Sequence, residues 1–329
     1  PSKKKIDLLM KIKCHHHKQQ IKKLLFVDGI GRTGKMLTSK IVTSLKNFEQ
    51  VEFSEFLEYT LAGMSLKKIK KDFAASFVNQ IINQIAYNKM IGRNQNYRST
   101  DLTSVKNFKK SQIYEKRAKS EEGTKVFKNL SKNKNYFIFM THDVMTNFKF
   151  FNELNFDYKM IQIYRNPYDM IFSWYKRGLG HRYNNDPSSF DILLKYKNIL
   201  CPYYVAGYEK KWIKMNEVEK CAQIVLNLIK KSLKNHKNTK LYRKIYTTTY
   251  ENIVQNSNIE VKKICKFLNT KSTSHTKRIL KLESCPKIID KKKQLKKKKF
   301  IISKLKKETA YKIYKMNKSF NKDVYGLIK

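Results

Sequence analysis

A glycine-rich segment near the start of the chain has the residue types of a phosphate-binding loop. It reads G-I-G-R-T-G-K from Gly29 to Lys35, which is the spacing G-x-x-x-x-G-K that opens nucleoside-triphosphate-binding loops. In those loops the next residue is Ser or Thr, whose hydroxyl binds Mg²⁺. Here it is Met36, and a thioether is a poor ligand for a hard cation that prefers oxygen. The segment therefore predicts either an ATP site or a site for a phosphate-rich ligand that needs no metal.

A second segment, "IYRNPYDMIFSWY" at 163–175, combines a helix start with a cation and a hydroxyl. Asn166 is a good N-cap residue, the proline after it suits the first helical position, and Asp169 is expected to reach back as a variant of the capping box. Arg165 directly precedes this helix, and Ser173 lies two turns into it. Because a helix N-terminus favours anions, this junction is a second candidate site for a phosphate group.

Apolar runs alternate with helical periodicity along most of the chain. The expected strands are 21–28, 50–56, 135–143, 158–164 and one within 240–253. Strands that alternate with helices predict an α/β fold with a central parallel β-sheet flanked by helices. The carboxyl ends of parallel strands share one edge of the sheet, so both candidate junctions can contact one ligand there.

The expected domain organisation is simple. Residues 1–19 form a basic tail, and residues 20–329 form a single α/β domain. Within that domain, 57–130 is mostly helical. Residues 285–329 are expected to hold a basic flap and a C-terminal helix.

The composition limits the possible functions without choosing one. The net charge is +45, and it comes from lysines spread along the chain, so a lysine-coated surface or attraction to a polyanion would both explain it. The hydrophobic fraction of 41% excludes wholesale disorder, and no run of about 18 apolar residues predicts a membrane span. Five scattered cysteines favour free thiols in a reducing compartment, so a cytoplasmic location is expected.

These motifs resemble those of the sulfotransferases that use 3′-phosphoadenosine 5′-phosphosulfate (PAPS). "GRTGKML" (31–37) is similar to the first motif of that family, P-[KR]-[ST]-G-T, and 163–175 matches the second, R-[ND]-P-x-D-x-x-x-S-x-Y. "FMTHD" (139–143), "ILCPYYVAGYEKKW" (199–212) and "YENIVQNSNIEVKKICKFLN" (250–269) resemble three further elements, in the family's order.

The resemblance implies a P-loop-containing, sulfotransferase-like architecture with PAPS as the donor. A sulfuryl group carries less negative charge than a phosphoryl group, so fixed cations can replace a metal and no metal is expected. Arg165 and Ser173 are implied to bind the 3′-phosphate, and Tyr250 to lie by the adenine. Arg32 and Lys35 are assigned to the 5′-phosphate and to the charge that grows on the leaving oxygen. The other expected donor-binding residues are Gly31, Thr33, Gly34 and Met36.

The base that activates the acceptor hydroxyl is open at this point. His142, after the Thr of the T-H element, is the base that the small-molecule branch of the family implies. The carbohydrate branch implies a Glu after the second strand, which gives Glu52 or Glu55. His181 is a further candidate for contact with the acceptor, which is an alcohol or a sugar hydroxyl.

Three features set this chain apart from the family pattern. Lys35 stands where the family has Thr, and the late R-K-G motif is absent, although lysines between 285 and 300 lie near its place. The middle region, 57–130, matches no element of the family and is expected to shape the acceptor pocket. Trp212 is expected to be a core residue. The sequence does not indicate an oligomeric state.

Two other functions stay open. An ATP-dependent kinase would use Gly34 and Lys35 with Mg²⁺ on a carboxylate such as Asp143. A basic protein that binds nucleic acid or another polyanion would depend on its lysines. The even spread of lysines and the presence of only nine arginines count against specific reading of nucleic-acid bases.

Overall fold

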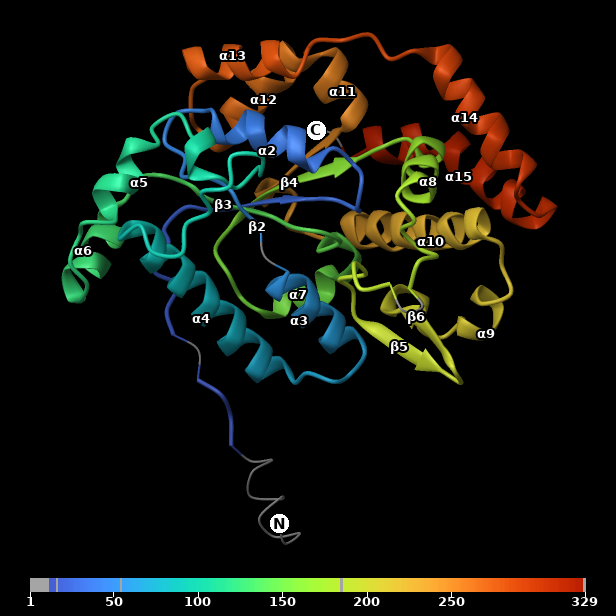
Figure 1. Cartoon of the computed structure of the whole chain (residues 1–329), viewed down its shortest axis with the longest axis horizontal. Coiled ribbons are helices and arrows are strands. Elements are labelled where there is room, and N and C mark those ends of the chain that lie inside the picture. The colour runs from blue at the N-terminus through green and yellow to red at the C-terminus, as the bar shows by residue number, and fades with distance from the viewer. Residues whose placement is uncertain (1–11, 16, 54, 184–185, 328–329) are drawn as a thin grey trace, which may run out of the picture.

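The computed structural model describes residues 12–15, 17–53, 55–183 and 186–327 (Figure 1). These residues form a sheet of five strands in the order β2-β3-β1-β4-β7, and neighbouring strands are parallel. The strands are β1 (Leu24–Asp28), β2 (Glu52–Phe53), β3 (Phe137–Met140), β4 (Lys159–Tyr164) and β7 (Ile245–Thr249). A separate antiparallel pair consists of β5 (Leu193–Tyr196) and β6 (Ile199–Pro202). The predicted α/β class with a central parallel sheet is confirmed.

Helices cover both faces of this sheet (Figure 1). Those of the first half are α2 (Lys35–Thr43), α3 (Phe56–Ser65), α4 (Lys71–Met90), α5 (Gln112–Arg117), α6 (Thr124–Lys132), α7 (Phe148–Glu153) and α8 (Pro167–Lys176). Those of the second half are α9 (Glu209–Trp212), α10 (Glu217–Asn238), α11 (Tyr250–Gln255), α12 (Ser257–Leu268), α13 (Ser274–Leu282), α14 (Lys291–Ser303) and α15 (Lys307–Tyr325). None of the helices within the described residues is long and apolar enough to cross a bilayer.

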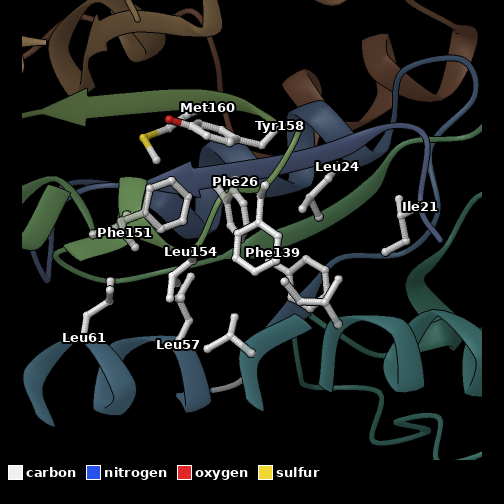
Figure 2. Packing of buried hydrophobic residues seen from close by; sticks show 14 of the residues in the cluster. Ile21, Leu24, Phe26, Leu57, Leu61, Phe139, Phe151, Leu154, Tyr158 and Met160 are labelled. Atoms are coloured by element: carbon white, nitrogen blue, oxygen red, sulfur yellow. The ribbon is translucent and has the colours of Figure 1, made fainter. Parts of the chain in front are cut away.

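The sequence of β1 explains the two-sided core. Its side chains alternate between the faces, as a strand requires. Leu24 and Phe26 pack with α3, α4 and α7, whereas Leu25 and Val27 pack with α2, α12 and α13. Figure 2 shows the first cluster. In it the rings of Phe26 and Phe151 pack edge to face, with their centroids 5.3 Å apart. All five residues of β1 are buried, which places this strand at the centre of the molecule.

Asp28, at the carboxyl end of β1, holds the turn that follows β3. Its carboxylate is fully buried and accepts hydrogen bonds from Thr141 Oγ1 at 3.0 Å and from the N–H groups of Val144 and Met145 at 3.1 and 3.0 Å. These bonds fix residues 141–145 against the middle strand of the sheet. The turn carries His142, so Asp28 sets the position of the candidate base.

The second strand is shorter than the predicted 50–56. The N–H of Gln50 donates to the Tyr114 hydroxyl at 2.9 Å, and its side-chain amide donates to the carbonyl oxygens of Leu102 and Ser104 at 2.8 Å. A tertiary contact therefore takes the backbone N–H of Gln50, and its side-chain amide holds the segment against a loop. Of the predicted segment, β2 retains two residues.

The expected helix at 167 begins as predicted, but one capping contact is wrong. Asn166 caps α8 by accepting from the N–H groups of Tyr168 and Asp169. The Asp169 carboxylate does not reach back as a capping-box variant. It accepts instead from Gln294 Nε2 and Lys297 Nζ of α14, both at 2.7 Å. The lysine-rich segment after 290 is thus a helix packed on α8.

The described part of the N-terminal tail lies along α4. The N–H of Cys14 donates to Asp72 Oδ2 and that of Gln20 to Asn83 Oδ1, both at 2.9 Å. Residues 1–11 and 16 of the expected tail lie outside the described residues. Trp212 is 1% exposed, as expected of a core residue. All five cysteines have free thiols.

Candidate active site

The loop between β1 and α2 forms an uncapped helix N-terminus. Gly34 is the N-cap residue of α2, with φ +96°, and no side chain caps the helix. The first N–H groups of a helix have no partner within it, so those at the start of α2 are available to an anion. A side chain at Gly34 would be strained at this φ, and its Cβ would lie 2.5 Å from the Tyr250 ring.

Tyr250 connects this loop to the second junction. It is the first residue of α11, directly after β7. One part of its ring packs against Gly34, and the guanidinium of Arg165 lies 4.2 Å from the ring centroid. The loop and the start of α8 therefore meet through one aromatic ring.

Arginines from the two junctions contact each other, and one of them bonds to Ser173. Arg32, at φ +73°, donates from Nε to Ser173 Oγ at 3.0 Å, and Arg165 Nη1 donates to the carbonyl oxygen of Arg32 at 2.9 Å. Burial lowers the pKa of Arg32, and the positive charges of Arg177 and Arg165 lower it further. Arg165 Nε is buried and has no hydrogen-bond partner among the described residues. Cations gathered in this way are stabilised by a bound anion.

The remaining loop residues shape this site in different ways. Trp174 Nε1 donates to the carbonyl oxygen of Gly31 at 2.8 Å, and a Cβ at Gly31 would meet that ring at 3.3 Å. The Thr33 side chain is buried and donates to the carbonyl oxygen of Ile30 at 2.9 Å, so it supports the loop from within. Met36 is 53% exposed on the first turn of α2.

Lys35 lies on the inner side of the loop. It is 3% exposed, and its ammonium donates to the carbonyl oxygen of Ile30 at 3.0 Å and to that of Gly29. Burial lowers its pKa, while the carboxylates of Asp143, Asp28 and Glu58 oppose that effect. Lys35 therefore lies between the loop backbone and a group of acidic side chains.

His142 contacts one of these acidic residues, Glu58. Its Nδ1 lies 3.0 Å from Glu58 Oε1, and its backbone N–H donates to the same oxygen at 2.5 Å. Burial and the Lys35 charge lower the pKa of the imidazole, so it is neutral near pH 7. Burial raises the pKa of Glu58 to about 8 against the opposing charge of Lys35. The pair thus consists of a neutral imidazole and a carboxyl group whose pKa of about 8 keeps it protonated at neutral pH.

The other predicted candidates for the base or for acceptor contact lie elsewhere or have no contact with His142. Glu52 pairs with Lys89 and lines a hollow of about 230 Å³ with residues of α4. Glu55 precedes α3 as its N-cap residue, and its negative charge is felt at His142. His181 packs against α10, with Nδ1 3.6 Å from the Cys221 thiol, so the prediction that it touches the acceptor finds no support in its position.

Sequence reasoning missed several residues near the imidazole. Glu58 lies one helical turn after Glu55. If the start of a helix had been predicted at 55, Glu58 would have been placed on the same face as Glu55. Asp191 is mostly buried and accepts from the hydroxyls of Tyr204 and Tyr183 at 3.1 and 3.3 Å. Tyr203 stacks near Tyr204, with ring centroids 4.2 Å apart. The loop that carries these residues has no periodicity from which its position could be read.

The comparison with protein families decides the family. A family model described as a sulfotransferase domain matches residues 26–326. The chain belongs to the sulfotransferase family. No curated protein matches this sulfotransferase.

Solved structures of three sulfotransferases are similar to this one at low identity. The sulfotransferase domain from the curacin biosynthetic pathway is 13% identical, with 77% of this chain and 75% of that one covered and a TM-score of 0.42. The corresponding domain of the Synechococcus PCC 7002 olefin synthase is 12% identical (81% and 79% covered, TM-score 0.40). Sulfotransferase STF9 from Mycobacterium avium is 10% identical (82% and 70% covered, TM-score 0.39).

Proposed function

We propose that this sulfotransferase moves the sulfuryl group of PAPS to a hydroxyl group of a small molecule or carbohydrate, in line and without a metal. The observation that carries the proposal is the cluster of Arg32, Arg165 and Ser173 at an uncapped helix N-terminus. The cluster is linked through Lys35 to a neutral imidazole at His142. Together they supply an anion site and a base, the two requirements of the reaction.

The residues present fit a donor with phosphates at two positions. Arg165 Nε has no partner, and the Ser173 hydroxyl accepts from Arg32, which leaves its proton to donate to a 3′-phosphate. The N–H groups at the start of α2 face a ligand that approaches Gly34, which suits the 5′-phosphate. Tyr250 is the ring on which we expect the adenine to rest.

Each residue then has a defined role during transfer. PAPS supplies the sulfuryl group, with its 5′-phosphate as the leaving group. The acceptor oxygen forms its bond to sulfur as the bond from sulfur to the phosphate oxygen breaks, and His142 takes the acceptor proton. Because Nδ1 faces Glu58, Nε2 is the nitrogen that is free to do so. Arg32 stabilises the negative charge that grows on the leaving oxygen.

We also propose that Lys35 contributes to donor binding, as predicted from the sequence. In this structure its ammonium bonds to loop carbonyl oxygens, so it supports the loop and places a positive charge behind it. That charge also reaches His142, whose pKa it lowers. Lys35 thus favours a bound anion on one side and an unprotonated base on the other.

The aromatic and acidic residues around His142 favour a ring-bearing acceptor with several hydroxyl groups. Tyr203 and Tyr204 offer adjacent rings, and Asp191 can accept hydrogen bonds from an acceptor. Sugars present apolar ring faces and hydroxyl groups to such surroundings. The cytoplasmic location and the absence of specific nucleic-acid binding remain predictions.

Calorimetric titration with 3′-phosphoadenosine 5′-phosphate (PAP) tests the donor site. We expect metal-independent binding in EDTA that weakens at least about 100-fold in Arg165→Ala, because two charge-assisted hydrogen bonds are lost. Lys176→Ala, a change of an exposed cation on α8, is the matched control. Binding of ATP that needs Mg²⁺ and ignores Arg165 would favour a kinase. Binding of neither nucleotide would favour a polyanion-binding protein.

A further inference from the structure

A second cavity lies at the opposite edge of the sheet. It has a volume of about 680 Å³ and is lined by Lys46, Asn47, Phe48, Glu49, Phe108, Lys109, Lys110, Ile113, Arg117, Asn135, Thr273, Ser274, His275 and Arg278. We call it the basic pocket. Phe48 pairs with Tyr136, which directly precedes β3, so the pocket is at the amino ends of the strands. The donor loop follows the carboxyl end of β1. The basic pocket is therefore separate from the candidate active site, and it is as large as a small-molecule site, roughly 300–1,000 Å³.

The charges on its walls are unbalanced. Its one carboxylate, Glu49, is held by Arg117 through two bonds of 2.8 and 3.0 Å, so these two charges cancel. Within the described part of the chain, no ion pair involves the remaining cations, Lys46, Lys109, Lys110 and Arg278. Four positive charges thus surround one hollow.

These cations destabilise one another. The pKa of Lys109 falls to about 8 through burial and the neighbouring charge of Lys110. Burial also lowers the pKa of His275, and Arg278 and Lys109 lower it further. A bound anion would oppose each of these shifts, because a nearby negative charge favours the protonated form.

The uncharged walls match the rest of an organic ligand. Phe48, Phe108 and Ile113 provide an apolar surface, while Asn47 and Asn135 carry amide groups. Helix α13 starts with Ser274, which lines the pocket, and its N-terminal dipole adds positive potential there.

We propose that the basic pocket binds a small organic anion that carries sulfate or phosphate groups on a ring-bearing body. The four cations would contact the anionic groups, with Lys109 held in place by its bond to the carbonyl oxygen of Leu45, and the apolar wall would contact the ring. A nucleotide and a sulfated sugar both meet this description, because each carries anionic groups on a ring-bearing body. The site does not depend on the proposed donor site, because none of its residues takes part in it.

The test is a titration followed by NMR of isoleucine methyl groups in the full chain. Ile113 lines the basic pocket, and Ile30 lies in the donor loop, so two signals report the two sites separately. The signals are assigned with Ile113→Val and Ile30→Val. The probes are ATP and a disulfated disaccharide, added to about 5 mM. We expect a saturable shift of Ile113 with at least one probe, with half-saturation below about 1 mM.

Charge variants then decide whether the pocket or the general surface charge binds the probe. Arg278→Glu should weaken binding at Ile113 at least about tenfold, because a charge-assisted contact becomes a repulsion. Lys277→Glu is the matched control, since this exposed neighbour on α13 does not line the pocket. An equal loss in both variants, or no shift of Ile113 with either probe, would overturn the proposal. A shift of Ile113 with only one probe identifies the source of the anion.

Discussion

Replacement of Glu58 by glutamine should stabilise the protein and slow the reaction at the same time. Burial raises the pKa of this carboxyl from 4.5 to about 8, so the folded state holds a proton that the unfolded chain has released. Between these pH values the folded state binds more protons, and the free energy of unfolding of the parent falls as the pH rises. Glutamine has no such proton to lose.

The magnitude follows from the pKa difference. At about 1.36 kcal/mol for each pH unit, the change from 4.5 to about 8 corresponds to as much as roughly 5 kcal/mol above pH 8. Below pH 4.5 both proteins carry a neutral side chain, so their free energies of unfolding should be close. The amide oxygen of glutamine can still accept both hydrogen bonds from His142.

Urea unfolding of both proteins at pH values from 4.5 to 9 measures this difference. We expect Glu58→Gln to gain stability relative to the parent steadily as the pH rises. We expect kcat to fall about 10²- to 10⁴-fold above about pH 8, where Glu58 of the parent is a carboxylate that can stabilise an imidazolium at His142 and the amide cannot. Glu55→Gln is the matched loss of a nearby carboxylate that does not contact His142. A stability difference that stays constant across the pH range, or one equally large in Glu55→Gln, would refute the reasoning.

Three further outcomes are expected. Gly34→Ala should lower PAP affinity at least about tenfold by calorimetry, because its Cβ would collide with the Tyr250 ring at an unfavourable φ; unchanged affinity would exclude a close approach of ligand and loop. Asp28→Asn should lower the free energy of unfolding by about 2–4 kcal/mol in urea, since a buried acceptor of three hydrogen bonds is weakened; a loss under 1 kcal/mol would mean that the turn is held otherwise. Lys297→Ala should change that free energy by less than about 1 kcal/mol but speed limited proteolysis of α14, because its partner Asp169 is then held by Gln294 alone; proteolysis at the parent rate would contradict this.

The two strand-to-helix junctions at Gly34 and Asn166 were predictable because their signals are local. A glycine loop between an apolar run and a helical period, and the cap at Asn166 beside Arg165, are short-range patterns that backbone geometry demands. The parallel sheet followed from the alternation of strands and helices. The sequence could not show that Arg32 bonds to Ser173, because 141 positions separate them.

The acceptor side was less predictable because it depends on tertiary contacts. The direction in which Lys35 points is decided by two loop carbonyl oxygens and by acids from three different elements. Glu58 gains its role only when α3 packs against the turn after β3. The shortening of the second strand likewise follows from contacts of Gln50 with a distant loop.

The anchoring of the His142 turn to Asp28 has a consequence for how acceptor preference can change over evolution. The proposed base is fixed to the central strand, whereas Asp191, Tyr203 and Tyr204 belong to a separate segment of the chain between α8 and α10. Under the proposed mechanism, insertions and substitutions in that segment could therefore change the acceptor without moving His142. The scaffold would then separate the proposed proton transfer from acceptor recognition.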